Sequence, residues 1–273
     1  MHMVLDGFDW RKAIDRHKNG PDREWIRARL QEYAVAGFAY LRDGGDRWGA
    51  GAAARALAPE YGITYRTPLA NLCKAGHYGA FIGKKYENFR EYRELIRQQR
   101  EEGADFVKIM ISGLMDFDRC GVLTEEGLSA EQIRELIHIA HEEGFSVMAH
   151  ANGARTVEAA AMYGVDSVEH GAYLHADALV AMAEMGTVWV PTLSTVGNLR
   201  GKGRFSEPDV RGILETAMEN VSKFAAMGGL LAPGSDAGAW AVGHGCESEE
   251  GWLRKVCTEA QLEDGNRRIM GKF

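Results

Sequence analysis

Apolar residues follow two alternating patterns along the chain. Stretches with apolar side chains at three- and four-residue spacing, typical of amphipathic helices, end at a glycine and lead into a short apolar run. Helices are predicted over residues 21–36, 86–102, 129–144, 155–163, 176–184 and 208–227, and strands over 38–41, 106–111, 145–149, 165–168, 187–190 and 230–232. Short strands that are apolar on both faces are typical of a buried parallel sheet. Their alternation with helices predicts an α/β barrel or a doubly wound open sheet.

The length and composition favour one barrel-sized domain. The chain has 273 residues, no linker and no exact repeat, so we expect residues 1–273 to form a single domain. The net charge of −7 argues against nucleic acid or an anionic membrane as a partner and leaves a small-molecule substrate. The four cysteines form no CxxC pair, and neither a signal peptide nor a membrane helix is recognisable. We therefore expect a cytoplasmic protein, and homo-oligomerisation stays open.

Polar residues gather where the predicted strands end. They are Asp43, Lys108, His150, His170 and Asp236. In an α/β barrel the C-terminal ends of all strands meet on one face, and active sites lie there. Several residues of ligand type at successive strand ends therefore indicate a shared site.

Lys108 carries the most information because Phe, Val, Ile and Met surround it in the sequence. Burial in such a strand lowers the pKa of an amine, and a neutral amine can react with carbon dioxide to give a carbamate. The alternative is a lysine paired with a buried carboxylate such as Asp236. Histidines at two consecutive strand ends, His150 and His170, favour a metal site, because imidazole is a common zinc ligand.

Several segments together resemble the amidohydrolase superfamily, most closely its prolidase-like and imidazolonepropionase-like branch. The runs DFVKIMISG, VMAHANG, SVEHGAYL and GSDAG resemble its strands four, five, six and eight, in that order. GFAYLRDGGD resembles the second strand, GHYG the loop after strand three, and DGNRRIMGKF the last barrel helix. The resemblance covers nearly the whole chain and implies a (β/α)8 TIM-type barrel.

The resemblance also implies a chemistry. Lys108, as a carbamate derived from CO2, would bridge two divalent metal ions, with zinc favoured and manganese or iron as alternatives. His150 and His170 would bind one metal, and Asp236 and His2, from a His-x-His pair, would bind the other. A metal-bridging hydroxide would attack an amide carbon, and Asp236 would carry its proton to the leaving amine. The expected activity is hydrolysis of an amide (C–N) bond in an N-acyl amino acid, a dipeptide or a cyclic amide.

The sequence departs from this pattern in three places. Only His2 represents the His-x-His pair, most of strand one is missing, and we expect the natural start to lie upstream of Met1. The β-sandwich that usually flanks the barrel is absent. Asn152 stands where relatives often have tyrosine, which argues against dipeptidase specificity.

Loops on the same face supply candidate substrate-binding residues. They are His77, Asn152, Tyr173 and His244. Glycine neighbours allow the loops around His77 and His244 to approach a ligand closely, and imidazole can donate a hydrogen bond to a carboxylate or an oxyanion.

Two alternatives remain at this stage. A one-metal deaminase of the same superfamily would lack the bridging lysine and would often place a glutamate three residues from the histidine of strand five, which this chain does not. A catalytically inactive barrel with a binding role would explain the incomplete His-x-His pair. Metal content distinguishes the inactive barrel from the hydrolase.

Overall fold

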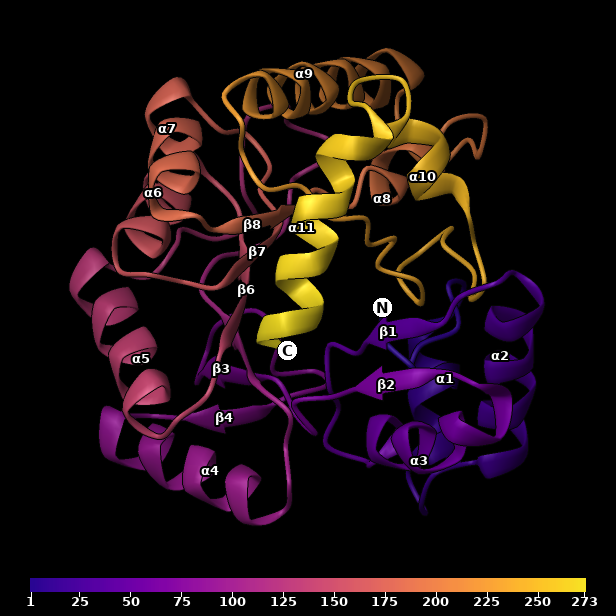
Figure 1. Cartoon of the computed structure of the whole chain (residues 1–273). Coiled ribbons are helices and arrows are strands. Elements are labelled where there is room, and N and C mark those ends of the chain that lie inside the picture. Colours follow the sequence, from indigo (N-terminus) through magenta and orange to yellow (C-terminus); the bar gives the residue numbers. More distant parts are fainter.

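Short parallel strands lie at the centre of the molecule, and helices surround them (Figure 1). The computed structural model describes all residues 1–273. The strands are β1 (Tyr40–Arg42), β2 (Thr64–Arg66), β3 (Leu72–Lys74), β4 (Lys84–Tyr86), β5 (Val107–Met110), β6 (Val147–Ala151), β7 (Ser167–His170) and β8 (Val188–Val190). The helices are α1 (Trp10–His17), α2 (Arg23–Val35), α3 (Ala50–Leu57), α4 (Phe89–Glu101), α5 (Ala130–Glu142), α6 (Ala154–Met162), α7 (Ala176–Met185), α8 (Ser194–Gly197), α9 (Glu207–Ala226), α10 (Ser248–Leu253) and α11 (Glu259–Lys272), and a 3-10 helix spans Ala58–Tyr61.

All strand pairs are parallel, as the buried apolar runs predict. One sheet contains β1 and β2, and the other has the order β4-β3-β5-β6-β7-β8. In the larger sheet Lys108 lies opposite Met148, and Ala151 lies opposite His170. This register brings the ends of β5, β6 and β7 to the same edge.

Hydrogen bonds outside the ladders link the two sheets and the N-terminal segment. The amide of Asp105, just before β5, donates to the carbonyl of Thr67, just after β2. His2 donates to the carbonyl of Ala237, and Gly44 donates to that of Met1. Residues 1–2 therefore lie between the end of β1 and the 236–238 segment.

The strand predicted over residues 230–232 is reduced to one isolated bridge, between Trp189 and Leu231. Its two hydrogen bonds join Trp189 to Leu230 and Ala232. The pattern also left β2, β3 and β4 unpredicted, since each has only three residues and β4 contains two lysines. The structure thus supports a parallel α/β fold, but no continuous eight-stranded ladder is formed.

Helix α11 closes the end of the strands opposite to the predicted site. The carbonyl of Phe273 accepts a hydrogen bond from the hydroxyl of Tyr40 (3.1 Å), and that of Lys272 accepts one from Ser146 (2.7 Å). Lys272 also pairs with Asp166 at 2.8 Å. These partners precede or begin β1, β6 and β7, so α11 lies across the strand starts, as Figure 1 shows at the centre of the view.

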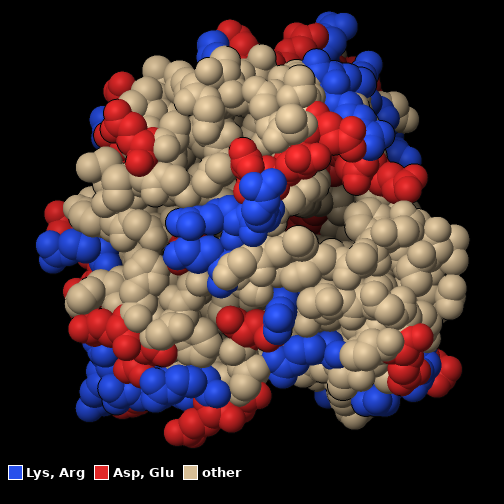
Figure 2. All heavy atoms as spheres, in the orientation of Figure 1, with Lys and Arg blue, Asp and Glu red and all other residues tan.

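Charges of both signs are interspersed on the face that carries α11. Figure 2 shows Lys and Arg side chains gathered over this helix and acidic side chains beside them toward α10. No helix of the chain combines the length and the apolar character that crossing a bilayer requires.

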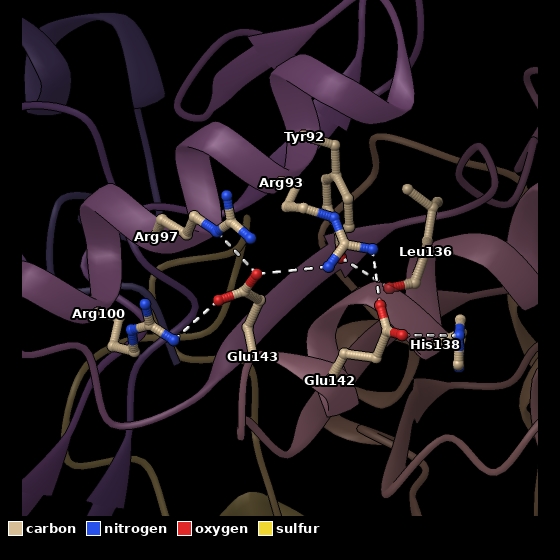
Figure 3. A network of polar contacts seen from close by, with 8 residues as sticks. All are labelled: Tyr92, Arg93, Arg97, Arg100, Leu136, His138, Glu142 and Glu143. Atoms are coloured by element: carbon tan, nitrogen blue, oxygen red, sulfur yellow. Dashed lines mark hydrogen bonds and ion pairs between the residues drawn. The ribbon is translucent and has the colours of Figure 1, made fainter.

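Glu143, at the end of α5, binds three arginines of α4, as Figure 3 shows. Its carboxylate accepts from Arg97 and Arg100 at 2.8 Å each and from Arg93 at 3.3 Å. Burial would raise the pKa of Glu143, but the arginines outweigh it and hold that pKa below its usual value. The carboxylate therefore stays charged between the two helices.

Candidate functional site

A small cavity of about 30 Å³ lies at the C-terminal ends of the strands. Its lining consists of Met1, His2, Gly44, Lys108, Met148, Glu169, His170, Thr192, Gly234 and Asp236. Gly44 allows the histidine ring to enter, because a Cβ at this position would lie 2.1 Å from the Cε1 atom of His2. The parallel register therefore brings four of the five predicted metal ligands to one cavity, and the fifth, His150, packs against His170 with ring centroids 4.7 Å apart.

Lys108 is buried in β5, with only 3% of its surface exposed. No carboxylate oxygen lies within 4.0 Å of its amine, so the structure does not contain the simple ion pair that the alternative interpretation required. Burial lowers the pKa of Lys108 from 10.5 to about 8, although the carboxylates of Glu169 and Asp236 offset part of the effect. A pKa of about 8 leaves roughly one-tenth of this amine neutral at pH 7.

The three histidines of the site are held neutral. Burial lowers the pKa values of His2, His150 and His170 well below 6.5, and the positive charge of Lys108 adds to the effect in each case. The Nδ1 atom of His170 lies 2.8 Å from the hydroxyl of Thr192, which leaves Nε2 for the cavity. The Nδ1 atom of His2 is buried without a hydrogen-bond partner. A neutral imidazole with a free nitrogen is the form that binds a metal.

Asp236 faces His2 across the cavity, with 3.6 Å between Oδ1 and Nε2. Burial raises the pKa of Asp236 from 3.8 to about 6, against the opposing effect of the N-terminal amine and Lys108. The side chain can therefore exist in both protonation states near neutral pH.

The backbone is strained on this face. Only six non-glycine residues of the chain have positive φ, and His170 (72°), Thr192 (50°) and Asp236 (54°) are among them. The left-handed region costs a non-glycine residue roughly 1–3 kcal/mol. Such strain concentrates at functional sites, and here it coincides with the cavity lining.

Glu169, which lines the cavity, forms a buried ion pair with Arg42. The Nη2 atom of Arg42 lies 3.1 Å from Oε1 of Glu169, and the side chains are 8% and 9% exposed. Ser167 donates a second hydrogen bond to the same oxygen at 2.7 Å. Burial would raise the pKa of Glu169, but Arg42 and Lys108 outweigh it and lower that pKa.

None of the four predicted substrate-binding residues lines the cavity. His77 lies half-buried 3.6 Å from a carboxylate oxygen of Glu125. His244 lies 3.0 Å from the hydroxyl of Tyr33 through Nδ1 and 2.8 Å from the carbonyl of Leu5 through Nε2. With both ring nitrogens engaged, His244 has the contacts of a structural residue, and the geometry gives no support to substrate binding by it.

The side chain of Asn152 is also engaged in hydrogen bonds within the protein. Its amide nitrogen donates to the carbonyl of Gly113 at 3.0 Å, and its amide oxygen accepts from the backbone of Ala172 at 2.9 Å. It lies 3.4 Å from Nε2 of His150, so it orders the environment of that ring. The hydroxyl of Tyr173 is buried without a partner, at a residue whose φ is 58°. Tyr173 is thus the better placed of these two for a polar ligand.

Sequence reasoning missed three residues of this face. Tyr78, next to the predicted His77, is the loop residue that packs on His150, with ring centroids 4.9 Å apart. Thr192 and Glu169 also line the cavity. The positions of Thr192 just after β8 and of Glu169 next to His170 are the signals that could have identified them.

These residues suit a divalent metal by their chemistry. The cavity brings together neutral imidazoles, a carboxylate and a lysine whose pKa is lowered. The Nδ1 atom of His2 has no hydrogen-bond partner in the protein. No three His, Cys, Asp or Glu side chains converge as a complete cage. A carbamate on Lys108 would supply the missing oxygen donors.

Comparison with known proteins shows a partial likeness in sequence and a likeness in fold over nearly the whole chain. No protein-family profile matches the sequence. Ochratoxinase from Aspergillus niger is 27% identical over 129 residues, which are 45% of this chain and only 25% of that relative. The solved structure of A. niger ochratoxinase has a TM-score of 0.77 at 19% identity and covers 97% of this chain and 67% of that structure.

Prolidases give similar matches. A Xaa-Pro dipeptidase with bound methionine has a TM-score of 0.76 at 21% identity, covering 99% of this chain and 71% of the dipeptidase. A prolidase complexed with N-methylphosphonate-L-proline has a TM-score of 0.72 at 20% identity, covering 97% and 72%. The chain therefore has the fold of prolidase-like amidohydrolases, which confirms the resemblance inferred from its sequence motifs.

Proposed function

We propose that this chain, with its amidohydrolase fold, is a metal-dependent hydrolase that cleaves an amide bond of a small molecule. The observation that carries the proposal is Lys108, buried at the strand ends without a carboxylate partner and surrounded by neutral histidines and Asp236. The activity of its structural neighbours on amides supports the reaction class. Substrates of the proposed kind are N-acyl amino acids, dipeptides and cyclic amides.

The residues divide the work by position. As a carbamate, Lys108 would contact two metal ions, with His150 and His170 holding one and His2 and Asp236 the other. Bound divalent metals, zinc in this proposal, supply the charge that acidifies a water and polarises the amide carbonyl. Asp236 accepts a proton at its carboxylate and returns it to the leaving nitrogen. Thr192 orients His170 through Nδ1, and Tyr78 covers His150.

The proposal includes the architecture. We propose that residues 1–273 form one (β/α)8 barrel domain, in which β2 and β3 are parts of one broken strand and residues 1–2 occupy the position of the first. The hydrogen bonds from Asp105 to Thr67, from His2 to Ala237 and from Gly44 to Met1 support closure. A cytoplasmic location belongs to the same proposal.

Replacing Lys108 tests the function directly. Purified protein and Lys108→Ala are compared for zinc, manganese and iron content by mass spectrometry and for hydrolysis of a panel of N-acyl amino acids and dipeptides. We expect near two metals per wild-type chain, loss of both metal and turnover in the variant, and partial rescue by a short carboxylic acid. Lys85→Ala, which removes an exposed lysine of β4, is the matched control.

The outcomes separate the alternatives. A metal-free wild-type protein without turnover would indicate the inactive barrel, and one metal per chain with release of ammonia would indicate the deaminase. Full activity of Lys108→Ala would refute the bridging role.

A further inference from the structure

A second, larger hollow lies outside the metal-type cavity. It is a groove of about 400 Å³ between α1 and two loops, lined by Trp10, Arg11, Ile14, Asp15, Lys18, Arg47, Trp48 and Phe81. Its volume falls within the range of small-molecule sites, which is roughly 300–1,000 Å³. None of its residues takes part in the proposed hydrolysis.

Aromatic rings form the apolar part of this groove. Trp10 and Phe81 meet edge to face, with centroids 5.4 Å apart and an interplanar angle of 71°. Trp10 is 42% exposed, unusual for a side chain of this size and apolar character, and Trp48 contributes a third ring. Exposed aromatic faces around a hollow are suited to a flat apolar ligand.

The charged part of the groove is mainly positive. The guanidinium carbon of Arg11 lies 4.3 Å from the Trp10 ring centroid, and that of Arg47 lies 4.6 Å from the Trp48 centroid. Neither arginine has a carboxylate within 4.0 Å. The acidic residue of the lining, Asp15, is paired with Lys18.

Stacking leaves the arginines available to an anion. A guanidinium that lies over a ring uses its face, while its N–H edges remain free for a bidentate contact with a carboxylate. Two such free edges in a protein of net charge −7 form a local positive site. The groove therefore complements a ligand that is both flat and negatively charged.

One loop contributes residues both to the groove and to the inner cavity, although the two share no lining residue. Gly44 lines the cavity, and Arg47 and Trp48 follow it in the same loop. The amide of Arg47 donates to the carbonyl of Ile82, which fixes this loop against the segment that carries Phe81. The ring centroid of Phe81 in turn lies 5.9 Å from that of Tyr78, the residue whose ring packs on His150.

We propose that this groove is a binding site for a planar aromatic carboxylate. The ring lies among Trp10, Trp48 and Phe81, and the carboxylate is bound by the free edges of Arg11 and Arg47. The site does not depend on hydrolysis, since its residues are distinct from those of the cavity.

The test measures the binding of 2-naphthoate to the full chain by isothermal titration calorimetry. We expect saturable one-to-one binding that weakens about tenfold or more in Arg47→Gln, because one charge-assisted contact is lost. The double variant R11Q/R47Q should lose binding. Arg16→Gln, on the same helix but outside the groove lining, is the matched control. The uncharged 2-naphthamide and the non-aromatic cyclohexanecarboxylate should each bind more weakly than 2-naphthoate.

The design separates this proposal from the hydrolase proposal. Lys108→Ala should bind 2-naphthoate as the wild type does, even if it is inactive. Loss of binding in Lys108→Ala with retention in R11Q/R47Q would place the ligand in the inner cavity and overturn the assignment. Equal affinity for 2-naphthoate and 2-naphthamide, or no saturable binding, would also overturn it. Thermal melting of each variant shows whether a loss reflects the groove or unfolding.

Discussion

Replacing Arg42 with methionine should destabilise the fold far more than the same change at a neighbouring arginine. Arg42 lies in β1 and pairs with the buried Glu169, which lines the cavity. Methionine keeps much of the aliphatic length but removes the charge, so the carboxylate of Glu169 keeps only the hydroxyl of Ser167 as a hydrogen-bond partner. The variant therefore leaves a buried carboxylate without its ion-pair partner, and only the more distant positive charges such as Lys108 still offset it.

The size of the effect follows from burial. Both side chains of the pair are less than one-tenth exposed. Breaking a buried ion pair by removing one partner costs about 3–5 kcal/mol, whereas an exposed pair contributes about 0–1 kcal/mol. For a chain of this length we expect Tm to fall by roughly 6–20 °C in R42M.

Arg66 provides the matched control. It lies directly opposite Arg42 in the β1–β2 ladder and pairs with Asp105 at 3.1 Å, but its side chain is 45% exposed. Urea denaturation followed by circular dichroism should give a small loss of unfolding free energy for R66M and a large one for R42M. The double variant R42M/E169M should recover part of the loss, because it removes the unpaired charge as well.

The pH dependence gives a second check on the same pair. The pKa of Glu169 lies below its usual 4.5 in the native protein, so the stabilising contribution of the pair is complete above that pH and is lost as the pH falls through the native pKa. R42M removes the largest effect that lowers the pKa of Glu169, so this pKa should rise and protonation should relieve the variant as the pH falls. The difference in the free energy of unfolding between wild type and R42M should therefore become smaller in acid. Equal losses for R42M and R66M, or a difference that grows in acid, would refute the reasoning.

Three further expectations concern the cavity. Asp236→Asn should lower kcat by roughly 10²–10⁴-fold while metal bound by the other ligands is retained, and near-normal turnover would remove Asp236 from the proton pathway. Thr192→Val removes the hydroxyl partner of His170 and should weaken metal affinity or activity by roughly 10–100-fold in a chelator competition; an unchanged affinity would contradict its orienting role. Dialysis against a chelator should lower Tm in differential scanning calorimetry, and added zinc should restore it, because a ligand bound to the native state stabilises that state. No shift on metal removal would argue against a bound metal.

Local sequence patterns were sufficient to predict an element where the interaction partners of its residues are close in the sequence. The helix predicted over residues 129–144 is α5, and its capping box between Ser129 and Gln132 is present. The strand predicted over residues 165–168 is β7, which pairs with β6 over residues 167–170. The apolar content did not set this boundary, because inward-facing Ser167 and Glu169 continue the strand and bind Arg42.

The convergence of the site residues could be predicted for a general reason. Parallel strands bring their C-terminal ends together, so Lys108 and His170 meet at one edge, and Asp236 follows the short bridged segment at Leu231. The contacts of loop residues could not be predicted in this way. His244 is held by Tyr33 and Leu5, more than 200 positions away in the sequence, and no local pattern reports such a contact.

The left-handed backbone at residues 170 and 236 has an evolutionary consequence. Glycine or asparagine would relieve the strain at both positions, so each retained histidine or aspartate carries a stability cost of roughly 1–3 kcal/mol. Most mutations destabilise proteins, and a lineage freed from the need for the ligands would gain stability by losing them. Relatives that have abandoned the chemistry should therefore be recognisable by glycine or asparagine at these two positions, before the rest of the fold has changed.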